Sequence, residues 1–321
     1  MDVQYTVLPQ SIGKGSFGQV HIGIHKVTGK LYAVKVEEKK AKQHLLKTEN
    51  IIIRYATASS SMTSASASTS ALPPGIIKSY FFWEDRVNYY MVTDLLGPTI
   101  GKLHTICGQS FGLKTTLMLA EQMISILKYY HQHNIIHRDI KPDNFLIEYG
   151  LPHKQIYLID FGLSKKFRIN GHHIPYKTGV ARMGSVRYMS VNCHRSEELS
   201  RRDDMYSLGY VLIYLFHGEL PWQTSAIREA KEDRYEYVYN FKKNTNNDKL
   251  TEELVCFDCK KQGKPCGFRR IMKAYFDYLD TLGFADDINY NYILKELLLC
   301  MEDHDMKYDY NWDWIKFYGT P

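Results

Sequence analysis

The chain contains no apolar run that reaches the roughly 18 residues expected of a membrane-spanning helix, so we expect no membrane partner. Residues 1–10 are strand-like and lack the basic start and apolar stretch of a secretory signal. Six cysteines in 321 residues are too few for a disulfide scaffold. We therefore expect reduced thiols and residence in the cytoplasm, the nucleus or both.

Charge is not concentrated in one place. The net charge of +6 favours anionic partners in general, but no dense Lys/Arg stripe with interleaved aromatic residues is present. We therefore do not expect nucleic acid as a partner. The length permits a large core and a division into two lobes.

Hydrophobic periodicity predicts a β-rich first part and a helical second part. We predict strands at 7–12, 20–24, 31–36, 80–83 and 89–93, and a helix at 39–55. Residues 57–70 are almost entirely Ser, Thr and Ala, which predicts a flexible insertion; we favour a spacer over a site of autophosphorylation. The second part predicts a helix from Leu113 to near Asn134 and a buried helix at 204–216 that Pro221 ends. We place the boundary at the Leu-Leu-Gly-Pro break, giving lobes of 1–96 and 97–321.

Two motifs carry the chemistry: HRDIKPDN at residues 137–144 and DFG at 160–162. Their spacing is typical of phosphoryl transfer. We assign Asp139 as the base that orients the substrate hydroxyl and Lys141 as the cation that stabilises the transferring phosphoryl group. Asn144 and Asp160 are the predicted Mg²⁺ ligands, because a hard cation prefers oxygen donors.

A glycine-rich segment, GKGSFGQV at residues 13–20, fits a phosphate-covering flap through Gly13, Gly15 and Gly18. Dinucleotide-binding folds use similar glycines, but there a helix follows, whereas Val20 begins an alternating, strand-like stretch. A strand-to-strand flap is therefore predicted, with a plain glycine-rich hairpin as the alternative.

Lys35 closes the third predicted strand, and Glu49 lies 14 residues further on. A lysine that contacts phosphates needs a carboxylate to hold its flexible side chain, so we predict an ion pair between them. Two solvated surface residues are the alternative, and Glu37 and Glu38 also lie nearby.

Several further segments resemble the casein kinase 1 family of serine/threonine protein kinases. The Ala-Pro-Glu that ordinary protein kinases carry after DFG is absent, and the chain instead reads RYMSVN at 187–192. The other matches are DLLGP at 94–98, HIPY at 173–176, SRRDD at 200–204, SLGYVL at 207–212 and LPWQ at 220–223.

The resemblance implies an α+β, bilobal protein kinase fold, with a β-rich N-lobe that has one main helix and a larger α-helical C-lobe. It implies ATP and Mg²⁺ as cofactors and Ser/Thr transfer without obligatory phosphorylation of the activation segment. Thr93 takes the gatekeeper position, where the family usually has Met. The residues that would line the adenine pocket are Ile12, Val20, Ala33, Leu96, Leu146 and Ile159, with Asp94 and Leu96 at the hinge.

The family prefers protein substrates with acidic or phosphorylated residues near the target. Arg187 and Gly218 match its anion site, and Lys177 and Arg182 are candidates for added charge. The family's Lys shortly after Pro-Trp-Gln is replaced, because Thr-Ser-Ala follows Gln223. We therefore expect a weaker acidic preference, with relaxed, non-primed selection as an alternative. A salt bridge within the lobe is the alternative role of Arg187.

Two rival functions remain open, a pseudokinase scaffold and a kinase of small molecules, although none of the expected catalytic residues is lost. We expect a monomer and, without a long C-terminal tail, constitutive activity. The spacing of Cys256, Cys259 and Cys266 hints at zinc, with Cys300 or His304 as a distant fourth ligand. Unliganded thiols are the alternative.

Overall fold

The computed structural model describes residues 4–15, 18–59, 72–150, 153–223, 234–263 and 266–318. Its contacts form two compact units. The N-terminal unit comprises 1–98 and 146–165, and the C-terminal unit comprises 99–145 and 166–321. The predicted boundary after Leu96 assigns residues 146–165 to the second lobe, whereas the contacts group them with the first unit. Most of the predicted insertion, residues 60–70, lies outside the described residues.

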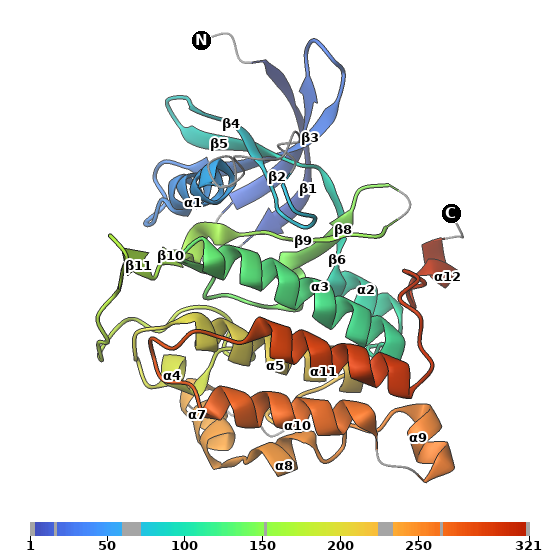
Figure 1. Cartoon of the computed structure of the whole chain (residues 1–321). Coiled ribbons are helices and arrows are strands. Elements are labelled where there is room, and N and C mark those ends of the chain that lie inside the picture. The colour runs from blue at the N-terminus through green and yellow to red at the C-terminus, as the bar shows by residue number, and fades with distance from the viewer. Residues whose placement is uncertain are drawn as a thin grey trace, which may run out of the picture. The chain divides into compact units, whose positions relative to one another are not determined.

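The N-terminal unit is built on a five-stranded antiparallel sheet with one helix beside it (Figure 1). The strand order is β1-β2-β3-β5-β4, and a second sheet has the order β6-β8-β9. The elements are β1 (Tyr5–Gly15), β2 (Gly18–His25), β3 (Leu31–Glu38), α1 (Leu45–Ser59), β4 (Ser79–Glu84), β5 (Asn88–Thr93), β6 (Leu96–Thr99), β8 (Phe145–Glu148), β9 (Ile156–Leu158) and the 3₁₀ helix η2 (Phe161–Leu163).

The helix α1 differs from its prediction at both ends. It begins at Leu45, not at residue 39, because the buried Glu37 carboxylate accepts a hydrogen bond from the backbone N–H of Leu46 at 2.8 Å. That bond satisfies a first-turn donor that has no partner within the helix. At the other end Thr57 continues the helix, and its hydroxyl donates to Ile53 O. Residues 57–59 are therefore helical and not part of a flexible insertion.

The C-terminal unit is mainly helical, and α3, α5, α10 and α11 pack on one another (Figure 1). Its helices are α2 (Ile100–Ile106), α3 (Leu113–Gln132), η1 (Pro142–Asn144), α4 (Val191–His194), α5 (Arg201–His217), α7 (Arg234–Asn244), α8 (Asn247–Thr251), α9 (Phe257–Gln262), α10 (Gly267–Asp280), α11 (Tyr290–Asp303) and α12 (Ile315–Tyr318). Short strands are β7 (Ile135–Ile136), β10 (Lys165–Lys166), β11 (Arg168–Ile169) and β12 (His172–His173).

The buried helix predicted at 204–216 is confirmed as α5, and its ends have clear causes. At its N-terminus the carboxylate of Asp203 accepts a hydrogen bond from the backbone N–H of Ser200 at 2.8 Å. Its C-terminus is set by Gly218, which adopts a φ of 96° and donates its N–H to Tyr214 O. The prediction that Pro221 ends the helix is therefore wrong, because the left-handed glycine stops it earlier.

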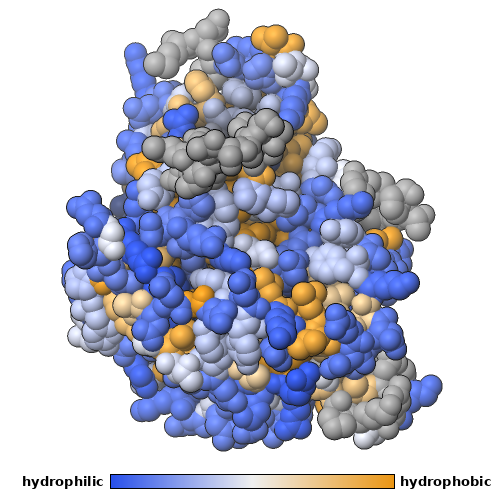
Figure 2. All heavy atoms as spheres, in the orientation of Figure 1, coloured by the Kyte–Doolittle hydropathy of each residue, from blue (hydrophilic) through white to orange (hydrophobic). Residues whose placement is uncertain are grey.

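None of the described helices is long and apolar enough to cross a lipid bilayer. The face drawn in Figure 2 is mostly hydrophilic, with apolar side chains in small separate areas.

Candidate functional site

A buried ion-pair cluster in the N-terminal unit joins β3, α1 and the residue before η2. Lys35 Nζ lies 2.5 Å from Glu49 Oε2 and 3.1 Å from Asp160 Oδ1. Burial disfavours the charged ammonium, but the two carboxylates outweigh this and hold the pKa of Lys35 above its ordinary value. The lysine side chain is therefore charged and fixed in one direction, as the spacing of Lys35 and Glu49 predicted. The alternative of two solvated surface residues does not apply.

Asp160 has a backbone conformation that few non-glycine residues adopt. Its φ and ψ are 68° and 63°, in the left-handed region. Such conformations cost free energy and concentrate at functional sites. The strained backbone presents one oxygen of Asp160 to Lys35, and both carboxylate oxygens are of the donor type that Mg²⁺ prefers.

The glycine-rich segment joins two strands, as predicted. Gly13 pairs with Val20, and Gly15 pairs with Gly18, in the antiparallel register of β1 and β2. A Cβ built on Gly18 would lie 2.1 Å from Val36 O, so only glycine fits there. Residues 16 and 17 lie outside the described residues.

The register of the sheet places the predicted nucleotide-facing side chains together. Val20 pairs with Lys35, and Ala33 pairs with Thr93, so all four point to one face. Leu146 and Ile159 belong to the same unit despite their distance in sequence, as do Ile12, Asp94 and Leu96. Thr93 is buried, and the side chain of Asp94 accepts a hydrogen bond from Tyr80 Oη at 2.6 Å.

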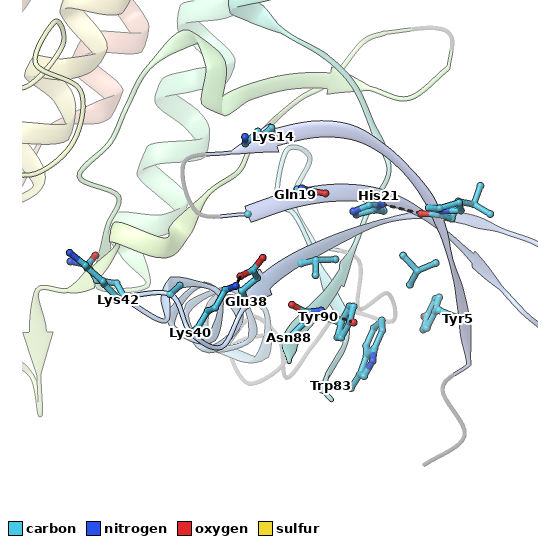
Figure 3. Close-up of a pocket in the computed structure, with 17 residues that line it drawn as sticks. Tyr5, Lys14, Gln19, His21, Glu38, Lys40, Lys42, Trp83, Asn88 and Tyr90 are labelled. Carbon is cyan, nitrogen blue, oxygen red and sulfur yellow. Dashed lines mark hydrogen bonds and ion pairs between the residues drawn. The ribbon is translucent and has the colours of Figure 1, made fainter. Parts of the chain in front are cut away.

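The opposite face of the same sheet carries a separate groove (Figure 3). Gln19, His21 and Tyr90 line it, from positions that alternate with Val20 and Met91. The rings of Trp83 and Tyr90 stack in parallel, with centroids 4.6 Å apart. Because strand neighbours point to opposite faces, this groove is not the surface on which Lys35 lies.

In the C-terminal unit, Asp139 is the centre of a network of short contacts. Lys141 Nζ lies 2.5 Å from Asp139 Oδ2, and the hydroxyl of Ser185 donates to Oδ1 at 2.9 Å. Asn144 Nδ2 donates to the backbone oxygen of Asp139 at 2.8 Å. Asp139 is itself buried. A Cβ on Gly184, which has a φ of 85°, would lie 2.5 Å from Arg138 O, so the segment that carries Ser185 approaches this loop closely.

Asp204, in the first turn of α5, holds the beginning of the 137–144 loop in place. Its carboxylate accepts hydrogen bonds from the backbone N–H groups of His137 at 2.6 Å and Arg138 at 2.8 Å. His131 Nε2 lies 3.1 Å from the same carboxylate. Burial disfavours the charged form of Asp204, but these hydrogen bonds outweigh the effect of burial and lower the pKa of Asp204. A buried, ionised carboxylate therefore holds two consecutive N–H groups of the catalytic motif.

Ser185 and Asp204 are the site residues to which the sequence analysis gave no role. Asp204 falls within a motif that the resemblance identified, but its contact with the loop spans 66 and 67 residues. Ser185 lies 46 residues from Asp139. Neither contact leaves a periodic or spacing signal in the sequence.

The predicted anion-site residues are brought together only in part. The Arg187 guanidinium lies 5.7 Å from the ring centre of Tyr188 and 5.4 Å from that of Tyr214. It forms no salt bridge with a carboxylate of the described residues. Gly218 follows Tyr214 by one helical turn, and its N–H donates to Tyr214 O.

The other two predicted cations have different surroundings. Arg182 is exposed; its Nε donates to Ser196 Oγ at 3.3 Å, and its guanidinium lies 6.0 Å from the ring centre of Tyr235. Lys177 is exposed as well, and its backbone oxygen accepts from the N–H of Glu198. Arg187 and Arg182 therefore contact different side chains.

Taken together, a Lys–Glu–Asp cluster, a glycine hairpin and an Asp–Lys–Asn loop define a phosphotransferase. A family model of the protein kinase domain matches residues 6–276. The chain therefore belongs to the protein kinase family, whose members use ATP, typically with Mg²⁺, and act on proteins. The predicted α+β, bilobal kinase fold is confirmed.

Proposed function

We propose that the chain is a serine/threonine protein kinase of casein kinase 1 type. It transfers the γ-phosphate of ATP to Ser or Thr of protein substrates that carry acidic or phosphorylated residues near the target. The observation that carries the proposal is the arrangement around Asp139, where Lys141, Asn144 and Ser185 converge on one carboxylate or its backbone.

In this proposal Asp139 orients the substrate hydroxyl and accepts its proton, while Lys141 supplies positive charge to the transferring phosphoryl group. Ser185 donates to Oδ1 of Asp139 and Lys141 to Oδ2. Because each carboxylate oxygen has its own donor, rotation of the carboxyl group is limited. Most of the rate enhancement comes from such positioning and from charge stabilisation.

The donor set fits a nucleotide with Mg²⁺. Asn144 uses its amide nitrogen for Asp139 O, so its amide oxygen remains as a ligand for a cation. Asp160 contributes carboxylate oxygen, and Lys35 supplies the charge that a phosphate group requires. When bound, Mg²⁺ neutralises the negative charge of the phosphate oxygens.

Activity without phosphorylation of the activation segment is supported by the surroundings of Arg138. Burial lowers the pKa of this guanidinium, and the carboxylates of Glu198 and Asp204 counteract that effect. Glu198 is buried and lies in the segment that follows the DFG motif. A built-in carboxylate thus provides the negative charge that a phosphate would otherwise supply. We infer constitutive activity from this arrangement.

A preference for acidic or phosphorylated substrates is supported by Arg187, which forms no ion pair within the part of the chain that the structure describes. An arginine fork held over two tyrosine rings is well suited to bind an anion. The Thr-Ser-Ala that replaces the family's Lys lies outside the described residues, so this part of the proposal rests on Arg187.

Transfer of radiolabelled phosphate from ATP to casein tests the proposed reaction. We expect Asp139→Asn to reduce the rate by about 10²- to 10⁴-fold, the range for loss of a positioned acid or base. The matched control is Asp143→Asn, which removes an exposed acid from the same loop. Undiminished transfer by Asp139→Asn would overturn the assignment of the base, and no transfer by the parent chain would favour a scaffold.

The substrate preference is tested separately with three versions of one peptide that carry phosphoserine, Asp or Ser upstream of the target. We expect the parent to prefer the anionic versions at low salt and Arg187→Ala to lose that preference. The control is Arg195→Ala, which removes a more exposed arginine of the same unit that donates to Tyr239. Equal rates on all three peptides would support the relaxed, non-primed alternative.

A further inference from the structure

Four residues with metal-binding side chains meet where three helices begin or end in the C-terminal unit. Cys256 is the residue before α9, and Cys259 lies in the first turn of that helix. Cys266 is the residue before α10, and His304 directly follows α11. The cluster thus joins the chain's only C-x-x-C segment to two long helices.

The ligand atoms are close enough to share one ion. Those of Cys256, Cys259 and His304 all lie within 4.8 Å of one another. The thiols of Cys256 and Cys266 are the two neighbours that interact with the Cys259 thiol. In addition, the backbone N–H of Cys256 donates to Cys266 Sγ at 3.3 Å. Cys266 therefore adjoins the group formed by the ligand atoms of Cys256, Cys259 and His304.

The geometry matches a small tetrahedral ion. With metal–sulfur bonds of about 2.3 Å, two sulfurs of a tetrahedral zinc site lie about 3.8 Å apart. The separations among the ligand atoms of Cys256, Cys259 and His304 need to shrink by no more than about 1 Å to reach that value, and Cys266 joins them by rotation of its side chain. The three cysteines are 9%, 6% and 3% exposed, so water does not compete freely for the ion.

The neighbouring glycine shows how tightly the helix ends meet. A Cβ built on Gly267 would lie 3.0 Å from Cys300 Sγ and 3.2 Å from His304 Nε2. Any larger residue after Cys266 would push His304 away from the three thiols. The imidazole of His304 forms no hydrogen bond or ion pair with the described residues, which leaves a nitrogen as a ligand.

We propose that Cys256, Cys259, Cys266 and His304 bind one zinc ion. Each thiol releases its proton to solvent as its sulfur–zinc bond forms, and the neutral imidazole gives its lone pair. Four protein ligands leave no open position, so the site is structural and not catalytic. The ion fixes α9 and the ends of α10 and α11 to one another. This inference does not depend on the proposed kinase activity.

The site is tested first on the unaltered full chain, purified under reducing conditions. We expect about one zinc per chain by elemental analysis. Replacement by Co²⁺ should give the intense visible bands of tetrahedral cobalt and a sulfur-to-cobalt charge-transfer band. Zinc should also protect Cys256, Cys259 and Cys266 from alkylation, as read by mass spectrometry, and leave the partly exposed Cys107 reactive. The melting temperature should fall when a chelator removes the ion.

Single variants then assign the ligands. Cys259→Ser and His304→Ala should each weaken cobalt binding at least tenfold, in line with the loss of one ligand, whereas Cys107→Ser should bind as the parent does. The proposal would be overturned by a chain that binds no zinc, shows no cobalt charge-transfer band, and has Cys256, Cys259 and Cys266 as reactive as Cys107. So would a disulfide between Cys256 and Cys259 in the reduced preparation, or full cobalt binding by the Cys256→Ser, Cys259→Ser double variant.

Discussion

The hydrogen bond from Ser185 to Asp139 gives the sharpest prediction about catalysis. Ser185→Ala removes one hydroxyl that donates to Asp139 Oδ1 at 2.9 Å. The backbone role of residue 185 persists, because its carbonyl still accepts from the N–H groups of Tyr188 and Met189. The change therefore tests the carboxylate contact and leaves the turn intact.

The expected loss follows from the kind of bond that is broken. A hydrogen bond to a charged group contributes about 1.5–3 kcal/mol. At about 1.4 kcal/mol for each factor of ten in rate, this is about a 10- to 150-fold decrease in kcat/KM. Ser185 is partly exposed, so water replaces some of the lost interaction and we expect the lower end, about tenfold.

The assay is steady-state phosphorylation of one peptide, with kcat, the KM for ATP and the melting temperature measured on each variant. We expect kcat to fall while the KM for ATP and the melting temperature stay constant. Ser185→Thr restores the hydroxyl and should recover most of the rate, and Ser196→Ala serves as a control from the same unit. Wild-type kcat in Ser185→Ala, with an unchanged melting temperature, would refute the view that this bond positions Asp139 during turnover.

Three further predictions follow from other parts of the chain. Glu198→Gln should reduce activity about tenfold or more, because it removes a buried charge beside Arg138; full activity would show that this charge is not needed. Thr93→Met should weaken the binding of a bulky hinge-directed inhibitor and leave the KM for ATP unchanged, because the larger side chain closes the space behind the gatekeeper. Equal inhibition of the variant and the parent would contradict the role given to Thr93. Burial lowers the pKa of His104 from 6.5 to about 4. The neutral, buried form of His104 therefore contributes to stability above pH 6.5, and this contribution is lost as the pH falls from 6.5 to about 4. It amounts to at most about 3 kcal/mol. His104→Phe should flatten that part of the curve of unfolding free energy against pH, and an unchanged slope would contradict the assignment.

The sequence predicted those parts of the site that depend on local order along the chain. The glycine hairpin is recognisable because Val20 and the residues after it alternate, and alternation has a direct structural meaning in a strand. Lys35 and Glu49 are separated by one strand end and one helical segment, so their pairing follows from the order of elements. The exact start of α1 did not follow, because it depends on a side chain of the preceding strand, Glu37.

Contacts that span many residues were not predictable in the same way, and α5 shows why. Its first turn carries two adjacent carboxylates with different partners. Asp203 accepts from Ser190 Oγ at 2.7 Å and from Asn192 Nδ2 at 2.9 Å, whereas Asp204 holds the backbone of the catalytic loop. The partners of Asp203 and Asp204 lie 11 to 67 residues away from them along the chain. Only the fold brings these partners to the N-terminus of α5.

This arrangement gives a physical reason for the segment that replaces Ala-Pro-Glu. Ser190 and Asn192, two residues apart in that segment, are both fixed to the buried Asp203. Ser190 also begins α4, where its hydroxyl accepts from the N–H of Cys193. The activation segment and the catalytic loop are therefore held by neighbouring residues of one helix. Because Asp203 and Asp204 are adjacent, the positions of both segments depend on the same first turn of α5.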